Sequence, residues 1–299
     1  MLTMGKIAVW TNYGLDGACS YLLLCSLKQN IAETYVTSPR RFREDFLKWQ
    51  FSTSLSNYET IYILDVDLSG CIDIVDRGNI VIIDTHTSHF NKKHLYSKAK
   101  LIIDKVSSTS KLLLRSFKTD FEKCLNDKQK YLVALVNDFI SGDRKVAASA
   151  GMNAVYWSYT GDKLQKFVED FKAGFTGFND QQQNVINIYN KRLLQSIAKL
   201  DIFTGALPTK GKQLKIVSTF CTAWYDEIAN HLLEYYKCDV VALVNTTGRY
   251  VVFICKKSCP LSMAKLAETL CDGSGNETNA VGELSEHFIK FTKTLNQVC

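Results

Sequence analysis

Residues 61–67 read IYILDVD and residues 80–86 read IVIIDTH, and both segments begin with an apolar run that ends in a carboxylate. Each run has apolar side chains at consecutive positions, which is typical of strands covered on both faces in a parallel sheet. We therefore predict two buried parallel strands with Asp65 and Asp84 at their carboxyl ends.

Around these two runs the chain alternates short strands with helical stretches. Strand, helix, strand in this rhythm predicts a doubly wound α/β domain with right-handed crossovers and a mainly parallel sheet. The further strands are expected at residues 6–11, 34–37 and 101–103, and the helices at residues 16–28, 39–50 and 108–117.

The chain has 299 residues, about twice the usual length of one domain, so two domains are expected. Apolar residues recur at helical spacing over residues 131–200, and the stretch GALPTKG at residues 205–211 then interrupts the pattern. A β-hairpin is expected at residues 240–255. We predict an α/β domain with a helical connector over residues 1–204 and a smaller α+β domain over residues 213–299.

The composition is that of an ordinary globular protein, with 46% hydrophobic and 22% charged residues. The net charge of +6 is compatible with an anionic ligand such as a nucleotide or short oligonucleotide. The ten cysteines stand singly or in apolar runs without a secretory signal or zinc-site spacing, so we expect reduced thiols. No apolar run reaches the roughly 18 residues of a membrane helix. We expect a cytoplasmic protein without membrane contact, and homo-oligomerisation stays open.

Polar residues at the carboxyl ends of the strands are the candidates for chemistry, because open parallel sheets bind ligands at that edge. Asp16 follows the first strand, and Asp65 and Asp84 end the two central ones, with His86 and His89 close behind. Each Asp alone is better explained as a turn residue or helix cap. Together they would repel one another unless a divalent cation neutralised them. The combination therefore favours a metal-dependent cleft.

Four short motifs follow one another in the first half of the chain: Asp16-Gly17-Ala18, then Asp65, then Asp84-Thr85-His86, then Asp138 in a helical segment. In this order they resemble the DHH superfamily of phosphoesterases, which includes single-strand exonucleases, nano-RNases and family II pyrophosphatases. The resemblance implies that Asp16, Asp65 and Asp138 hold Mn²⁺ or Mg²⁺. It also implies that His86 binds or protonates the phosphate and that Asp84 orients neighbouring groups.

The resemblance extends into the predicted second domain. That domain of the family carries a basic residue for the substrate and ends in a Gly-Gly-Gly-His loop followed by Ala-Ala-Gly. Here the chain has Lys256, and then reads Gly273-Ser274-Gly275-Asn276 and Ala280-Val281-Gly282. The resemblance implies that Lys256, Gly275 and Asn276 bind the substrate.

The chain departs from the family pattern where two metal ions would be held. Trp10, Asn12 and Gly14 stand at upstream ligand positions, and Thr85 replaces the first His of Asp-His-His. Of the three upstream residues, only Asn12 offers an oxygen. Two-metal hydrolysis needs two ions about 3.5–4 Å apart, whereas three carboxylates can hold one ion with water as further ligands. We expect one divalent cation at most.

Two functions therefore stay open. The first is a metal-dependent phosphoesterase with a reduced site that acts on a nucleotide, short oligonucleotide or similar phosphate ester. The second is a catalytically inactive protein of the same fold that binds a nucleotide or anion, or serves in an assembly. Kinase-type and serine-hydrolase chemistry are unsupported, since GxxxxGK[ST], GxGxxG and GxSxG motifs are missing. The basic and aromatic stretch at residues 38–49 is interpreted as an amphipathic helix.

Overall fold

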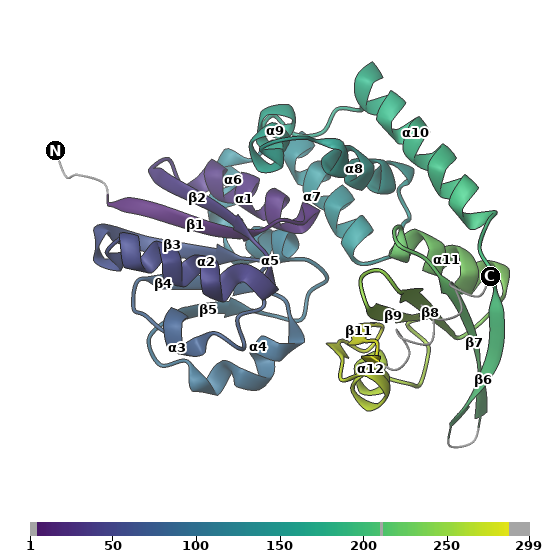
Figure 1. Ribbon diagram of the computed structural model, residues 1–299. Helices are drawn as coiled ribbons and strands as arrows, with labels where there is room; N and C mark the ends of the chain where they lie inside the picture. Colours follow the sequence, from purple (N-terminus) through teal and green to yellow (C-terminus); the bar gives the residue numbers. More distant parts are fainter. Residues whose placement is uncertain (1–4, 210–211, 287–299) are drawn as a thin grey trace. The chain divides into compact units, whose positions relative to one another are not determined.

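The computed structural model describes residues 5–209 and 212–286 (Figure 1). The chain divides into two compact units, residues 1–186 and 187–299. The division falls within helix α10 (Asp180–Ile197), not at the glycine-rich interruption that the sequence suggested. Strand β6 (Phe203–Thr209) includes residues 205–209 of that interruption. Pro208 is compatible with this strand because β6 lies at the edge of its sheet, where one side of the backbone needs no partner.

The first unit is built on a five-stranded parallel sheet of β1 (Lys6–Asn12), β2 (Ile31–Thr37), β3 (Tyr58–Leu64), β4 (Ile80–Asp84) and β5 (Lys100–Ile103). The strand order is β2-β1-β3-β4-β5, and every neighbouring pair is parallel. The predicted parallel α/β sheet is thus confirmed. In this order the winding reverses between β1 and β3, and doubly wound folds bind ligands at the carboxyl ends of such a pair.

Helices cover both faces of this sheet, which explains the consecutive apolar residues of its strands. Val9 and Leu64 face one core, and Ala8 and Ile63 face the other. The helices of the unit are α1 (Leu15–Leu27), α2 (Pro39–Ser52), α3 (Ile72–Val75), α4 (Thr87–Lys92), α5 (Thr109–Ser116), α6 (Lys118–Cys124), α7 (Asp127–Ile140), α8 (Ala147–Ser158) and α9 (Lys163–Phe171), with short 3-10 turns η1 (Leu55–Asn57) and η2 (Lys93–Leu95).

The second unit is a six-stranded mixed sheet that contains β6 together with β7 (Lys212–Phe220), β8 (Val240–Asn245), β9 (Tyr250–Cys255), β10 (Ser274–Gly275) and β11 (Asn279–Glu283). The order is β10-β11-β9-β8-β7-β6, with β7 and β8 parallel and the other pairs antiparallel. The predicted hairpin is the pair β8 and β9. Helices α11 (Tyr225–Tyr235) and α12 (Met263–Cys271) pack against the sheet, which confirms a smaller α+β unit.

The cysteines in the described part of the chain are all free thiols. Within the same residues, no helix combines the length and the apolar character needed to cross a membrane.

Candidate functional site

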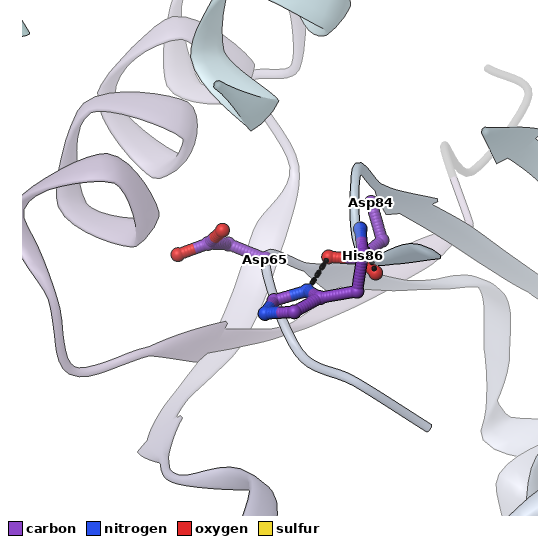
Figure 2. A group of neighbouring side chains, drawn as sticks. All are labelled: Asp65, Asp84 and His86. Carbon is purple, nitrogen blue, oxygen red and sulfur yellow. Dashed lines mark hydrogen bonds and ion pairs between the residues drawn. The ribbon is translucent and has the colours of Figure 1, made fainter. Parts of the chain in front are cut away.

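Three side chains converge at the carboxyl edge of the first sheet (Figure 2). A carboxylate oxygen of Asp65, one of Asp84 and a ring nitrogen of His86 all lie within 4.8 Å of one another. Asp65 directly follows β3, and Asp84 is the last residue of β4. Because Leu64 pairs with Ile83 in the parallel register, the two carboxylates emerge at the same edge. The structure thus brings together three of the residues that the sequence singled out.

Asp65 stands in a strained backbone conformation. Its φ of +58° lies in the left-handed region, which costs a non-glycine residue about 1–3 kcal/mol. The buried carboxylate accepts hydrogen bonds from Thr109 Oγ1 at 3.0 Å and from Asn12 Nδ2 at 3.3 Å. Burial raises the pKa of Asp65 well above its ordinary value, and the charges of Asp16 and Asp84 raise it further. A buried carboxylate in a strained backbone conformation lowers the stability of the folded protein. Such a residue is typical of a functional position.

Asp84 is fully buried and holds His86 beside it. His86 Nδ1 lies 2.7 Å from Asp84 Oδ1, and the His86 backbone N–H donates to Oδ2 at 3.0 Å. Burial raises the pKa of Asp84, but the hydrogen bond with His86 and the close approach of the His89 ring outweigh burial and hold this pKa below its usual range. Burial lowers the pKa of His86, but the bond to Asp84 and the nearby carboxylates outweigh it and raise the pKa to about 9. Without a cation at the site, these shifts favour a carboxylate beside an imidazolium at neutral pH.

His89 has a structural role that the sequence analysis left undefined. Its Nε2 accepts the backbone N–H of Leu68 at 2.8 Å, so this nitrogen carries no proton and Nδ1 is the protonated one. Nδ1 lies 2.8 Å from Asp84 Oδ2, close to it but poorly aligned for a hydrogen bond. His89 therefore ties the segment after β3 to the end of β4.

Asp16 lies beside the cluster, but helix α5 occupies its oxygens. Oδ2 accepts the Thr109 N–H at 2.6 Å, and Oδ1 accepts the N–H of Ser110 at 2.9 Å and its hydroxyl at 2.6 Å. These are the first N–H groups of α5, so Asp16 acts as a cap for this helix. Burial raises the pKa of Asp16, although the bonds from α5 oppose this effect. Thr109 joins Asp16 to Asp65, and direct metal binding by Asp16 stays a prediction.

Asp138 accepts backbone N–H groups of the segment that leads into α8. Its Oδ1 accepts the N–H of Lys145 at 3.1 Å, and its Oδ2 accepts the N–H of Val146 at 3.0 Å. Burial raises the pKa of Asp138, but these bonds outweigh it and the net shift is downward. Its neighbour Asn137 instead accepts a hydrogen bond from Ser108 at the start of α5. Asp138 is not part of the Asp65–Asp84–His86 group, and its role as a ligand stays a prediction.

Asn12 contacts the cluster through its amide nitrogen. Its Nδ2 donates to Asp65, while its Oδ1 is buried without any hydrogen-bond partner. Carboxylate and amide oxygens are the ligand types that Mg²⁺ and Mn²⁺ prefer. Among the described residues, His, Cys, Asp and Glu form no other group with such spacing. The residues present therefore fit one divalent cation.

The predicted substrate residues of the second unit lie at strand ends. Lys256 is exposed directly after β9. Gly275 in β10 lies so close to β11 that an added Cβ would meet Ala280 Cα at 2.4 Å. Asn276 Oδ1 accepts the N–H of Thr278 at 2.9 Å. Gly275 and Asn276 thus shape a tight turn, and substrate binding by all three predicted residues stays a prediction.

Comparison of the sequence with protein families and with curated proteins finds no match. Solved structures do match, over nearly the whole chain. The pGpG-specific phosphodiesterase PggH from Vibrio cholerae has a TM-score of 0.57 at 10% identity, with 97% of both chains covered. An exopolyphosphatase-related protein from Bacteroides fragilis has a TM-score of 0.53 at 14% identity, with 98% of this chain and 91% of the other covered.

RecJ from Thermus thermophilus, in complex with Mn²⁺, has a TM-score of 0.52 at 13% identity. The match covers 97% of this chain and 51% of RecJ. This chain has the fold of the DHH superfamily. At 10–14% identity the likeness establishes the fold that the motif order predicted, and the chemistry has to be argued from the residues of this chain.

Proposed function

We propose that the first unit binds a phosphate group of a nucleotide or short oligonucleotide through a single divalent cation. The observation that carries the proposal is the convergence of Asp65, Asp84 and His86 within 4.8 Å at the carboxyl edge of the sheet. This edge includes the ends of β1 and β3, where the strand order reverses. Doubly wound folds bind their ligands at that point.

Asp65, Asp84 and Asn12 are the proposed ligands of the cation, Mn²⁺ or Mg²⁺. A bound cation neutralises the carboxylates and polarises a phosphoryl oxygen. The buried Asn12 Oδ1 lacks a partner and would gain one. Asp16, whose oxygens already accept N–H groups of α5, positions Thr109 against Asp65.

His86 is the proposed contact for the phosphate. Its side chain is 41% exposed, and Nδ1 is already bonded to Asp84, which leaves the other ring nitrogen for a ligand. When protonated, this nitrogen donates a hydrogen bond to a phosphate oxygen, and hydrogen bonds between charged partners are the stronger ones. The binding partners of the similar structures support this ligand class, since one is specific for pGpG and another was solved with Mn²⁺.

Hydrolysis is the second candidate function, and His86 is the residue that favours it. A protonated imidazole beside a phosphate can deliver its proton to the leaving oxygen. The reduced ligand set weighs against efficient hydrolysis, because Trp10, Gly14 and Thr85 stand where the family motifs carry metal ligands. We therefore propose slow or absent turnover. Substrate contact by Lys256, Gly275 and Asn276 remains a proposal as well.

Fluorescence anisotropy with a labelled, 5′-phosphorylated oligodeoxynucleotide tests the proposal. Binding should require Mn²⁺, disappear in EDTA, and weaken at least tenfold in Asp65→Asn. The matched control is Asp73→Asn, which removes an exposed carboxylate paired with Arg43 on the surface. Affinity that is unchanged by EDTA and by Asp65→Asn would contradict the proposed site. Cleavage of the same probe by the unaltered protein, lost in His86→Gln, would add the hydrolytic function.

A further inference from the structure

Two large aromatic side chains lie exposed and adjacent to each other, and one of them directly follows Asn12 in the chain. Tyr13 is 48% exposed and Trp157 is 44% exposed, and their ring centroids are 5.7 Å apart with an interplanar angle of 71°. Tyr13 directly follows Asn12, whose Nδ2 donates to Asp65. Consecutive Cα atoms are about 3.8 Å apart, so the aromatic pair begins one residue from the proposed cation site.

The pair is fixed in place, although its ring surfaces are exposed to solvent. Tyr156 is buried in the core, and its hydroxyl donates to the backbone carbonyl of Tyr13 at 2.6 Å. The Tyr13 N–H in turn donates to the carbonyl of Thr37 at 3.0 Å. These two bonds hold the segment after β1 against α8 on one side and β2 on the other. The backbone that carries the Tyr13 ring is therefore preorganised.

A cation accompanies the aromatic pair. Lys163 Nζ lies 4.5 Å from the centroid of the Trp157 ring, and it also donates to the Trp157 carbonyl at 3.4 Å. Rigid aromatic faces next to a basic side chain are the features with which proteins stack the bases of single-stranded nucleic acids.

The other aromatic and basic stretch of this unit offers no such surface. In α2 the side chains of Phe42, Phe46 and Trp49 are all buried in the core beneath the helix. This agrees with the interpretation of that stretch as an amphipathic helix. Phe51 near the end of α2 is exposed, but only the pair of Tyr13 and Trp157, among these aromatic residues, adjoins Asn12 in the chain, through Tyr13.

We propose that Tyr13 and Trp157, flanked by Lys163, form a stacking platform for a base of a single-stranded oligonucleotide whose phosphate lies at the Asp65–His86 site. The proposal rests on the function proposed above and narrows its ligand: the base is recognised as well as the phosphate. Stacking accepts the flat face of any base, so the platform binds with little sequence preference.

The test compares two fluorescein-labelled probes with the same phosphates, a short single-stranded oligodeoxyadenylate and its abasic counterpart, on the full chain with Mn²⁺. The unaltered protein should bind the base-containing probe more tightly. Tyr13→Ala and Trp157→Ala should each weaken that binding about 5- to 100-fold, the range expected for one lost stacking contact, and leave the abasic probe unchanged. The matched control is Phe51→Ala, which removes an aromatic ring that is 89% exposed on α2 and should change neither affinity.

A second readout keeps the test valid if an alanine variant fails to fold. Binding of the base-containing probe should quench tryptophan fluorescence in the unaltered protein. The quench should largely disappear in Trp157→Phe, which keeps a ring at this position, and persist in Trp224→Phe, because Trp10 and Trp49 are buried and Trp224 belongs to the second unit.

Three other outcomes would contradict the stacking proposal, and they differ in what they imply for the phosphate site. Equal affinity of the unaltered protein for both probes would refute base stacking and leave the phosphate site standing. Equal losses for both probes in Tyr13→Ala would show that the substitution disturbs Asn12 and Asp65, and not a base contact. No binding of either probe to the unaltered protein would refute the platform and the proposed function together.

Discussion

Replacing Asp65 by Asn should stabilise the metal-free protein and abolish its cation site. Oxygens of Asp65 and Asp84 lie within 4.8 Å of one another, and two unit charges at that separation repel by about 3.5 kcal/mol at an effective dielectric constant of about 20. The neighbouring His86 imidazolium and the raised pKa of Asp65 relieve part of this repulsion. A net gain of about 1–2 kcal/mol is therefore expected.

The local geometry favours this substitution. Asparagine tolerates the left-handed backbone conformation at this position as well as aspartate does. The new amide can accept the Thr109 hydroxyl with its oxygen and donate to Asn12 Oδ1, which now has no partner, once the Asn12 amide rotates. For a unit of this size the gain corresponds to a rise in Tm of about 2–8 °C.

Thermal unfolding followed by circular dichroism, in EDTA and in Mn²⁺, measures both effects. In EDTA the variant should unfold at the higher temperature. Mn²⁺ at about one hundred times its Kd should stabilise the unaltered protein by about 2.7 kcal/mol and leave the variant unchanged. A variant that is less stable in EDTA, or that gains as much from Mn²⁺ as the unaltered protein, would refute the reasoning.

Three further predictions concern neighbouring groups. The pKa of His86 is about 9 in the folded protein, above the ordinary histidine value of 6.5. The protonated His86 therefore contributes its full stabilisation of the folded state below about pH 6.5, and this stabilisation is lost as the pH rises through 9. In EDTA the Tm should fall over that window, and His86→Gln should flatten the fall; a profile that His86→Gln leaves unaltered would contradict this. Asp138→Ala should lower Tm by about 2–4 °C, since the loss of its hydrogen bonds from the Lys145 and Val146 N–H groups costs about 1 kcal/mol, without changing Mn²⁺ affinity in a calorimetric titration. A lost Mn²⁺ site would instead make Asp138 a ligand. Asp16→Ala should lower both Tm and Mn²⁺ affinity, because it frees Thr109, which holds Asp65; unchanged values of both would show that this cap does not support the site.

The architecture of the first unit could be predicted because each buried strand is visible in its own short stretch of sequence. The consecutive apolar residues of β3 and β4 follow directly from burial on both faces, and the sequence shows them without ambiguity. The unit boundary could not be predicted in the same way. A glycine- and proline-containing stretch reads as a linker, yet at the edge of a sheet it forms β6, and only the pairing with β7 reveals this.

Only those site residues that directly follow or end a strand could be placed from the sequence. Asp65 and Asp84 meet because adjacent parallel strands end at the same edge. Asp138 and Asn137 differ by one helical position, about 100° of rotation, and the sequence does not show which of them faces α5. The role of His89 depends on a backbone N–H of Leu68, 21 positions earlier in the chain, which no motif encodes.

The number of Mn²⁺ ions bound per chain shows directly whether the protein holds a single cation at Asp65 and Asp84. Electron paramagnetic resonance titration of free Mn²⁺ measures this number. We expect one ion in the unaltered protein, one in Asp73→Asn, and none in Asp65→Asn. Two ions per chain, none at all, or one that persists in Asp65→Asn would contradict a single cation at Asp65 and Asp84.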